Sequence, residues 1–344
     1  MKALVLEEKR RLSLRDFPIT ETVGPYDVKI QIKACGICGS DIHYFVEGAI
    51  GSFIVKAPLI MGHEAAGIVI EKGEKVANIE KGDMVCMEPG IPNAHSHEVL
   101  EGIYNIDPEV VFWATPPVHG CLRETVVHPA QFCFKLPHGM SAAEGAMMEP
   151  LAIGIEAAKK AALKPGDTAL VVGSGTIGVM CALSALSGGC STVFISDVKQ
   201  EKLDFIGAYD KNIVPVNSGK TDLLEFIMKK TGGKGCNVVF EASGNPRVYP
   251  DFFRALRKGG KAVLVGMMNG TVPLDVAFLQ GRGVSIETIF RYTNCFERAI
   301  ALVNAGKIDI KRFISKTFTF EDSLAAYEYA AAGHADTIKV MIEL

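Results

Sequence analysis

The sequence predicts an α/β fold in two parts, a mostly β part followed by a doubly wound parallel sheet. Its 344 residues exceed what one hydrophobic core usually takes and suit two domains. In the first third of the chain, short runs alternate apolar and polar side chains between glycines and prolines, which is typical of strands with one buried face. After residue 165, continuous apolar runs alternate with helical stretches, which is typical of a parallel sheet covered on both faces.

The expected elements follow this change of pattern. Strands are expected at 3–6, 28–32, 66–70 and 84–87 in the first part, and at 168–172, 192–196, 237–241, 262–265 and 285–290 in the second. Helices are expected at about 177–186 and at 203–208. The tail predicts a helix at 296–305, an extended segment at 313–320, a helix at 322–332 and a strand at 337–342. The pattern alone leaves open whether this tail extends the parallel sheet or returns to the first part.

Composition excludes several classes of partner. A net charge of −3 gives no electrostatic reason to expect a nucleic-acid or membrane partner. No apolar run reaches the roughly 18–20 residues of a transmembrane helix, and the N-terminal residues do not have the pattern of a signal peptide. The nine cysteines are scattered and odd in number, so we expect reduced thiols and a cytoplasmic location.

A glycine-rich turn joins the strand at 168–172 to the next helix. Gly173, Gly175 and Gly178 have G-x-G-x-x-G spacing, and Asp197 ends the following strand. In this context the glycines allow a tight turn, close approach of the backbone to a pyrophosphate, and packing of the helix on the strand. The turn therefore predicts a Rossmann dinucleotide site. Asp197 favours NAD over NADP, and Lys202 could weaken that preference. The alternative is a glycine turn that binds no nucleotide.

Three residues in the first part could bind a metal. Cys38, His63 and Glu64 offer a thiolate, an imidazole and a carboxylate, which suit zinc and leave the open position that a catalytic zinc needs. Taken singly, each has a structural alternative, since a cysteine is often a small buried hydrophobe. Cys35 and Cys38 also form a lone C-x-x-C, for which a redox role is the alternative. A dinucleotide site downstream favours the zinc interpretation, because hydride transfer from an alcohol needs a Lewis acid.

Five segments carry a resemblance that covers essentially the whole chain. They are Gly-Ile-Cys-Gly-Ser-Asp-Ile-His-Tyr at 36–44, Gly-His-Glu-Ala-Ala-Gly at 62–67, Phe-Trp-Ala-Thr-Pro-Pro at 112–117, Met-Glu-Pro-Leu at 148–151 and Phe-Arg-Tyr at 290–292. With these segments the chain resembles the zinc-dependent medium-chain alcohol dehydrogenase superfamily. Within it, the chain is most similar to the polyol branch of sorbitol and xylitol dehydrogenases, the bacterial xylitol dehydrogenases above all. The resemblance implies a GroES-like, mostly β catalytic domain at 1–150, completed by 291–344, and a Rossmann NAD-binding domain at 151–290.

The resemblance also implies roles for individual residues. It makes Cys38, His63 and Glu64 the zinc ligands. Ser40 would lie on the proton path, and Tyr44 would border the substrate. Two further residues would contact the polyol, Arg291 and Tyr292, and Glu149 would be either an alternative zinc ligand or a partner that holds the zinc water. The implied NAD-binding residues are Gly173, Gly175, Ile177, Gly178, Asp197, Lys202, Val265, Gly266, Met267 and Phe290.

One departure from the superfamily concerns a second metal. Many relatives carry a structural zinc on four cysteines, and alignment on the Glu-Pro-Gly turn at 88–90 places Asn93, Ser96, Val99 and Asp107 at those positions. Because none is a cysteine, we expect one catalytic zinc and no structural zinc. The nearby His95 and His97 are expected to be solvated loop residues rather than a replacement site.

The resemblance therefore implies an NAD-dependent zinc enzyme that oxidises a small-molecule polyol, xylitol to D-xylulose in the first instance. Sorbitol or L-iditol oxidation is the alternative within the same branch, and a threonine or simple alcohol dehydrogenase is the alternative outside it. A non-catalytic NAD(P)H-binding protein or a quinone reductase of the same fold would lack the three metal ligands. By resemblance, the assembly is expected to be a homotetramer.

Overall fold

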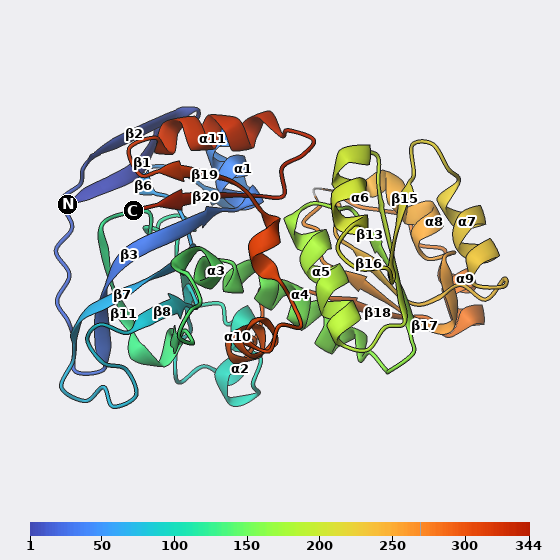
Figure 1. Ribbon diagram of the computed structural model, residues 1–344, viewed down its shortest axis with the longest axis horizontal. Helices are drawn as coiled ribbons and strands as arrows, with labels where there is room; N and C mark the ends of the chain where they lie inside the picture. The colour runs from blue at the N-terminus through green and yellow to red at the C-terminus, as the bar shows by residue number, and fades with distance from the viewer. Residues whose placement is uncertain (269) are drawn as a thin grey trace. The chain divides into compact units, whose positions relative to one another are not determined.

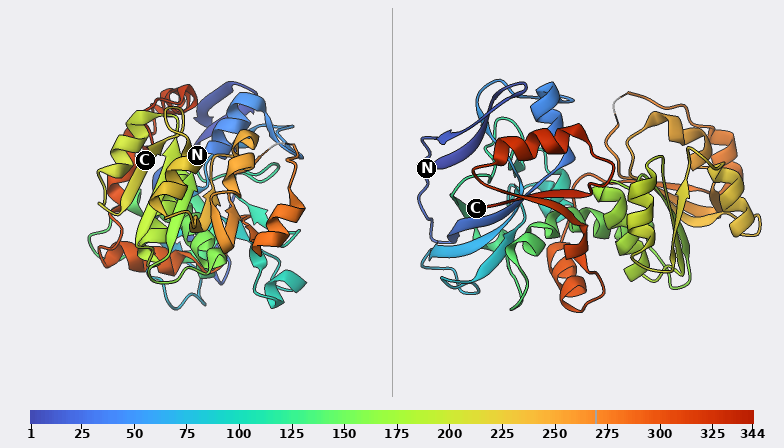
Figure 2. Two further views of the ribbon diagram at one scale, coloured as in Figure 1. Left: turned by 90° about the vertical axis from the view of Figure 1, so that its right-hand side faces the viewer. Right: turned by 45° about the horizontal axis from the view of Figure 1, so that its top comes forward.

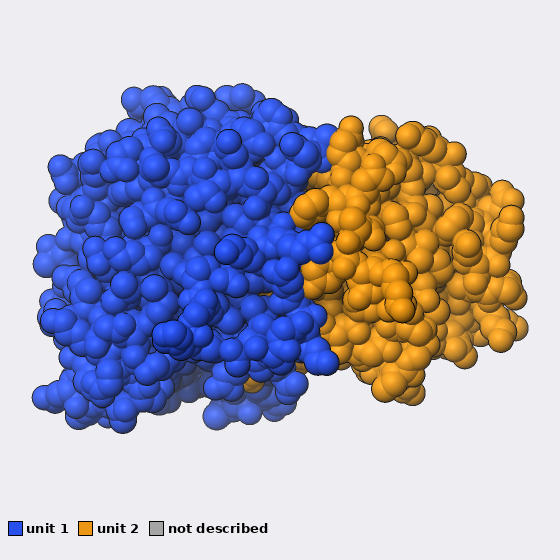
Figure 3. Space-filling view, in the orientation of Figure 1, with its two compact units in different colours: residues 1–149, 296–344 blue, residues 150–295 orange. Residues whose placement is uncertain are grey.

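The computed structural model describes residues 1–268 and 270–344 (Figure 1). The chain divides into two compact units (Figure 3). Unit 1 contains residues 1–149 and 296–344, and unit 2 contains residues 150–295. Within the described ranges, no helix is both long and apolar enough to cross a bilayer.

Unit 1 is built on a sheet with strand order β12-β8-β7-β3-β20-β19, in which β11 also pairs with β3. Its strands are β3 (Asp27–Ile37), β7 (Glu64–Lys72), β8 (Met84–Met87), β11 (Thr125–Pro129), β12 (Cys133–Lys135), β19 (Ile314–Thr319) and β20 (Lys339–Glu343). The alternation expected for these strands is clear in β3, where Val28, Ile30 and Ile32 are buried and the intervening side chains are more exposed. A second sheet contains β2 (Arg11–Asp16), β1 (Lys2–Glu8) and β6 (Leu59–Ile60), in that order.

The tail of the chain belongs to unit 1. Strand β20 inserts between β3 and β19, and its antiparallel register with β3 pairs Met341 with Gly36 and Ile342 with Cys35. Helix α11 (Ser323–Ala332) packs against both C-terminal strands. Figure 2 shows these C-terminal segments, in red, beside the blue strand β3. The question left open by the sequence pattern is thereby answered, because the tail returns to the first part of the fold.

Unit 2 contains a parallel sheet with strand order β15-β14-β13-β16-β17-β18. Its strands are β13 (Thr168–Val172), β14 (Thr192–Asp197), β15 (Ile213–Asn217), β16 (Cys236–Glu241), β17 (Leu256–Leu264) and β18 (Ser285–Thr288). Its helices are α5 (Thr176–Ser187), α6 (Gln200–Gly207), α7 (Leu223–Lys230), α8 (Tyr249–Phe252) and α9 (Val276–Arg282), together with most of α4 (Met148–Ala161). This order is the doubly wound Rossmann arrangement, whose ligands bind beyond the carboxyl ends of the strands where the order reverses, between β13 and β16. The predicted α/β fold class is confirmed.

Candidate metal and coenzyme sites

Strand pairing brings the three candidate metal ligands together. Cys38 caps helix α1 (Gly39–Glu47) directly after β3, whereas His63 and Glu64 lie at the start of β7. In the antiparallel register of these strands, Gly36 lies opposite Glu64. The Sγ of Cys38, a ring nitrogen of His63 and a carboxylate oxygen of Glu64 consequently all lie within 4.8 Å of one another. Residues that are distant in sequence thus form one compact cluster.

Two glycines make room for this cluster. A Cβ atom at Gly36 would lie 2.1 Å from Oε2 of Glu64, so only glycine leaves space for that carboxylate. Gly62 has a φ of +86°, a left-handed conformation that other residues rarely adopt, and it turns the chain immediately before His63. The geometry of the cluster therefore requires glycine at positions 36 and 62.

Asp41 connects the two segments that carry the ligands. Its carboxylate accepts a hydrogen bond from the backbone N–H of Cys38 at 3.0 Å and another from the N–H of Gly62 at 3.3 Å. Its Oδ1 also lies 3.6 Å from Nδ1 of His63, and its side chain is buried. An outer carboxylate of this kind fixes the orientation of a ligating imidazole. Sequence reasoning assigned Asp41 no role, although an acidic residue three positions after a helix N-cap is a recognisable capping signal.

Lys339 is the partner of Glu64 that sequence reasoning missed. Its Nζ donates to Oε1 and Oε2 of Glu64 at 2.6 and 2.7 Å and to the carbonyl of Ile37 at 3.0 Å. The side chains of Lys339 and Glu64 are 2% and 1% exposed. Burial lowers the pKa of Lys339, but the adjacent Glu64 carboxylate raises it further, so the net shift is upward and the ammonium stays charged. No local pattern could reveal this pair, because its members lie at opposite ends of the sequence.

His63 is held in a strongly polar environment. Burial alone lowers the pKa of its imidazole, but Asp41 and Cys38 act in the opposite direction and raise it well above its usual value. A site that attracts a proton to the imidazole also attracts a cation, which would compete with that proton.

The remaining candidate residues of unit 1 lie on α1 and at the start of α4. Ser40 is in the first turn of α1 and half-buried, and Tyr44 lies one turn later with its side chain buried. Glu149 is 6% exposed and, among the described residues, is not part of the cluster of ligand atoms. Burial raises the pKa of Glu88 to about 7, and the charge of Glu149 adds to that rise. The side chains of Tyr44, Glu88 and Glu149 are therefore largely shielded from water.

The positions aligned with a structural zinc site form hydrogen bonds within their loop. The carboxylate of Asp107 accepts from the backbone N–H of Asn93 at 2.6 Å and of Glu109 at 3.0 Å. Ser96 caps helix α2 (His97–Leu100) by accepting from the N–H of Val99 at 3.2 Å. The side chains of His95 and His97 are exposed. Asp107 thus ties together the two ends of this lobe.

In unit 2, the glycine turn has the geometry that a dinucleotide site requires. Gly173 has a φ of +101°, and a Cβ atom at Gly178 would lie 1.9 Å from the carbonyl oxygen of Gly173. Gly175 caps α5 without a side chain, and a Cβ atom there would meet no neighbour within 4 Å. The amide groups at the start of α5, including that of the half-buried Ile177, are consequently accessible to an anion at the carboxyl end of β13.

Asp197 lies beside this turn at the end of β14. Its Oδ2 accepts from the N–H and the hydroxyl of Ser174, both at 2.8 Å, and its Oδ1 accepts from the N–H groups of Val198 at 2.7 Å and Lys199 at 3.1 Å. Partial burial raises the pKa of Asp197, but these hydrogen bonds outweigh it, so the pKa falls and the group stays ionised. Burial lowers the pKa of Lys202, which lies on α6.

The other coenzyme candidates follow β17 and β18. The N–H groups of Val265 and Gly266 both donate to the carbonyl of Glu241 at 2.8 Å, which fixes them beyond the end of β17. Met267 and Phe290 are exposed, and the guanidinium of Arg291 lies 4.7 Å from the centre of the Phe290 ring. Tyr292, by contrast, is buried. The structure thus places the candidates of unit 2 at the carboxyl ends of β13, β14, β17 and β18, the edge at which such sheets bind ligands.

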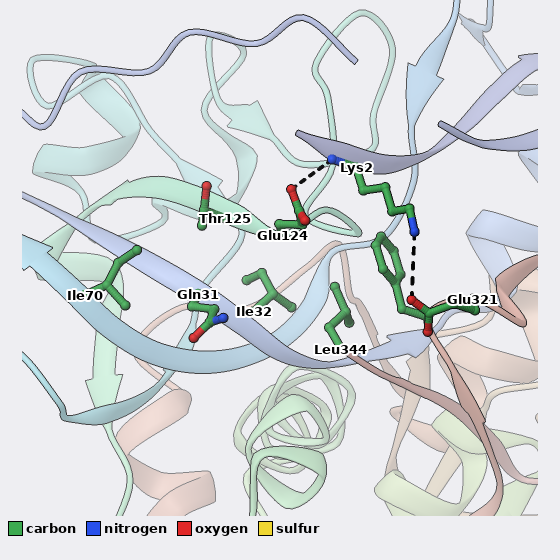
Figure 4. A pocket seen from close by; sticks show the side chains of 9 residues that line it. Lys2, Gln31, Ile32, Ile70, Glu124, Thr125, Glu321 and Leu344 are labelled. Carbon is green, nitrogen blue, oxygen red and sulfur yellow. Dashed lines mark hydrogen bonds and ion pairs between the residues drawn. The ribbon is translucent and has the colours of Figure 1, made fainter. Parts of the chain in front are cut away.

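A separate pocket of about 590 Å³ lies in unit 1 (Figure 4). The side chain of Lys2 lies 4.0 Å from Glu321 across it, and its backbone N–H donates to Glu124. The other lining residues are Gln31, Ile32, Ile70, Thr125, Phe320 and Leu344. None of the candidate site residues lines this pocket.

Comparison with known proteins identifies the family. The alcohol dehydrogenase GroES-like domain matches residues 24–138, and the zinc-binding dehydrogenase family matches residues 176–305. A D-xylulose reductase from Morganella morganii is 48% identical, over 96% of this chain and 98% of that protein. The chain belongs to the zinc-binding dehydrogenase family of alcohol dehydrogenases.

Other relatives of this zinc-binding dehydrogenase agree. A sorbitol dehydrogenase from Arabidopsis thaliana is 40% identical, over 94% of this chain and 90% of that protein. The crystal structure of 2R,3R-butanediol dehydrogenase from Bacillus subtilis superimposes with a TM-score of 0.90 at 27% identity, covering 100% of this chain and 99% of that one. The resemblance to the polyol branch and the GroES-like plus Rossmann fold are confirmed, and the protein is an oxidoreductase.

Proposed function

We propose that this dehydrogenase oxidises xylitol to D-xylulose, using NAD and one catalytic zinc. The observation that carries the proposal is the cluster of Cys38, His63 and Glu64, in which His63 and Glu64 are buried and Cys38 is half-buried, in a chain 48% identical to a D-xylulose reductase. In the reaction the carbinol carbon loses a hydride to NAD, and the hydroxyl group loses a proton. Sorbitol or L-iditol oxidation is the second candidate, because a sorbitol dehydrogenase is 40% identical over nearly the same length.

The donor set of the cluster fits zinc. A thiolate, an imidazole and a carboxylate are ligands that zinc accepts, and three of them are the usual number at a catalytic zinc. Zinc bound by these residues would act as a Lewis acid that lowers the pKa of the substrate hydroxyl. Asp41 would hold the His63 ring, and Glu149 would act from outside the cluster as a partner rather than as a ligand.

Other side chains would transfer the proton and bind the polyol. Ser40, half-buried and two residues after Cys38, would carry the proton toward solvent. Tyr44 would border the substrate. Arg291 is a rigid fork of donors that suits neighbouring hydroxyl oxygens, and Tyr292 would shape that part of the site from its buried position.

The residues at the carboxyl ends of β13, β14 and β17 would bind NAD. Pyrophosphate would lie on the start of α5, and Val265, Gly266 and Met267 would lie beside the nicotinamide. Asp197 already accepts four hydrogen bonds, so a ribose hydroxyl would take the place of the Ser174 hydroxyl as a donor. As a charged group, Asp197 would also repel the 2′-phosphate of NADP.

We further assign residues 1–150 with 291–344 to the catalytic domain and residues 151–290 to the NAD-binding domain. None of the nine cysteines, all of which the structure describes, forms a disulfide, and this supports a reducing compartment such as the cytoplasm. The proposed assembly is a homotetramer, as inferred from the family resemblance.

Initial rates with a panel of alcohols test the proposal. We expect the highest kcat/KM with xylitol, followed by sorbitol and ribitol, with NAD well above NADP. L-threonine and ethanol should be poor substrates, because a site that hydrogen-bonds several hydroxyls rejects analogues that lack them. A preference for ethanol or L-threonine would contradict the polyol assignment, and equal use of NADP would contradict the role of Asp197.

A further inference from the structure

The segment that carries Arg291 has an unusual backbone. It follows β18, and it contains two non-glycine residues with positive φ, Arg291 at +58° and Asn294 at +52°. Residues with a Cβ atom rarely adopt this left-handed conformation, and they keep it only when the surrounding structure holds them there. The contacts that hold this segment therefore determine where the Arg291 side chain begins.

An ion pair on α4 holds the middle of the segment. The Nζ of Lys159 donates to Oε2 of Glu156 at 2.6 Å and to the carbonyl oxygen of Thr293 at 2.7 Å. The same Oε2 accepts from the N–H of Thr293 at 3.3 Å and lies 3.3 Å from Sγ of Cys295. Both backbone polar groups of Thr293 are thus bound by one pair of charges, between the two left-handed residues.

Burial indicates that this pair is more than a surface contact. Glu156 is 4% exposed, and Thr293 and Cys295 are buried as well, whereas the Lys159 side chain is 35% exposed. A buried carboxylate must have its charge compensated, so the position of Glu156 depends on Lys159 and on the N–H of Thr293. The pair and the segment therefore fix one another.

We infer that Glu156 and Lys159 are positioning residues for Arg291 and so help to set the preference of the enzyme for polyols over simple alcohols. The inference rests on the proposed function of Arg291 as the residue that binds polyol hydroxyls. By clamping Thr293, the pair holds the backbone of Arg291 in its left-handed conformation and aims the guanidinium, which lies over the Phe290 ring. A pair that served only to stabilise α4 would change stability without changing the choice among alcohols.

The test compares xylitol with 2-butanol in the full-length, zinc-loaded enzyme at saturating NAD. Lys159→Met removes the ammonium group that donates to both Glu156 and the carbonyl oxygen of Thr293. We expect the KM for xylitol to rise about tenfold or more, because displacing a binding group by about 1 Å is enough for such losses. The kcat/KM for 2-butanol should change by less than about threefold, and the dissociation constant of NAD should stay the same.

Three further variants control this experiment. Lys160→Met changes the next lysine of the helix, whose side chain makes none of these bonds, and should behave as wild type. Lys159→Arg keeps the charge and the donors and should restore most of the xylitol activity. Glu156→Gln keeps an acceptor but removes the charge, and it provides the same comparison if Lys159→Met folds poorly.

A double variant separates the possible failures. If Lys159 acts through Arg291, then adding Lys159→Met to Arg291→Met should cause no further loss of xylitol activity. Additive losses, or an equal loss of xylitol and 2-butanol activity in Lys159→Met, would overturn the positioning role while leaving the proposed function intact. If Arg291→Met itself leaves the ratio of the two activities unchanged, the assigned role of Arg291 is wrong and the inference falls with it. A wild-type enzyme that does not oxidise xylitol would instead refute the proposed function.

Discussion

Glu64 belongs both to the candidate zinc cluster and to a buried ion pair with Lys339. Its carboxylate is buried, and in the structure it is compensated by the ammonium of Lys339. A zinc ion on Cys38, His63 and Glu64 would bring a second positive charge to the same carboxylate. We therefore expect the Lys339 ammonium and the zinc ion to replace one another in part in their effect on stability, although only zinc would act as a Lewis acid.

Lys339→Met tests this view. Without metal, the variant leaves a buried carboxylate uncompensated, so we expect the free energy of unfolding to fall by about 3–5 kcal/mol. Zinc should restore a substantial part of that loss, because it supplies positive charge to Glu64. The measurement is denaturant unfolding of metal-free and zinc-loaded protein, with the exposed Lys307→Met as the matched control. An equal loss in both forms would mean that Lys339 acts by packing alone.

Glu88 makes stability depend on pH. Burial raises its pKa from 4.5 to about 7 in the folded state. The folded protein thus binds this proton more tightly than the unfolded chain does. The stabilisation that comes from protonated Glu88 is fully present below about pH 4.5 and is lost as the pH rises through about 7. From pH 5 to pH 8, Glu88 should therefore lower the free energy of unfolding by about 2–3 kcal/mol. Urea unfolding at both pH values should show this difference in the free energy of unfolding in the wild type and not in Glu88→Gln. The same difference in both proteins would mean that other groups cause the pH dependence.

At the scale of the element, side-chain hydrogen bonds hold the lobe around α2 together. Asp107 is 2% exposed and accepts from two backbone N–H groups that would otherwise be unsatisfied. The carboxylate of Asp107 therefore links the backbone at Asn93 to the backbone at Glu109.

Asp107→Ala should loosen this lobe selectively. Loss of the two acceptor sites should cost about 1–3 kcal/mol and raise amide exchange and protease cleavage within residues 93–110. Zinc content should not change. Glu101→Ala, an exposed residue of the same lobe, is the control. Unchanged amide exchange in Asp107→Ala would show that the lobe is held by its apolar contacts instead.

The sequence predicts an element well when the residues that specify it are close together in the chain. Strand β13 and the turn after it are evident because an apolar run, three glycines and a helix follow in close order. Strand β15 was missed because Pro215 interrupts it, and the structure tolerates that proline because β15 lies at the edge of its sheet. Helix α1 was missed because it begins with Gly39 and Ser40, which are weak helix formers.

Within the candidate site, the sequence does not predict contacts between residues that lie far apart along the chain. Cys38, His63 and Glu64 were named from their chemistry and from the family resemblance, and the pairing of β3 with β7 brings them together. The contacts of Asp41 with Gly62, of Lys339 with Glu64 and of Lys159 with Thr293 depend on tertiary structure. A pattern within one segment carries no information about such partners.

At the scale of the whole molecule, the proposed zinc and the proposed coenzyme bind to different units. We expect one zinc per chain by elemental analysis of protein purified without chelator. Removal of that zinc should raise amide exchange in β3, β7 and β20 of unit 1, because a ligand stabilises the state that binds it. Strands β13 and β14 of unit 2 should be unaffected by chelator and protected instead by NAD. Two tightly bound zinc ions per chain would contradict this prediction.

The return of the tail to unit 1 has a consequence for biosynthesis. Unit 2 is one continuous stretch of chain, so it can fold while later residues are still being added at the ribosome. Unit 1 cannot, because β3 lacks its neighbour β20 and Glu64 lacks its cation until residue 339 has been translated. The first-made half of the enzyme is thus the last to become native. During that interval residues 34–37 of β3 lack their partner strand, and we expect the protein to depend most on a chaperone at this stage.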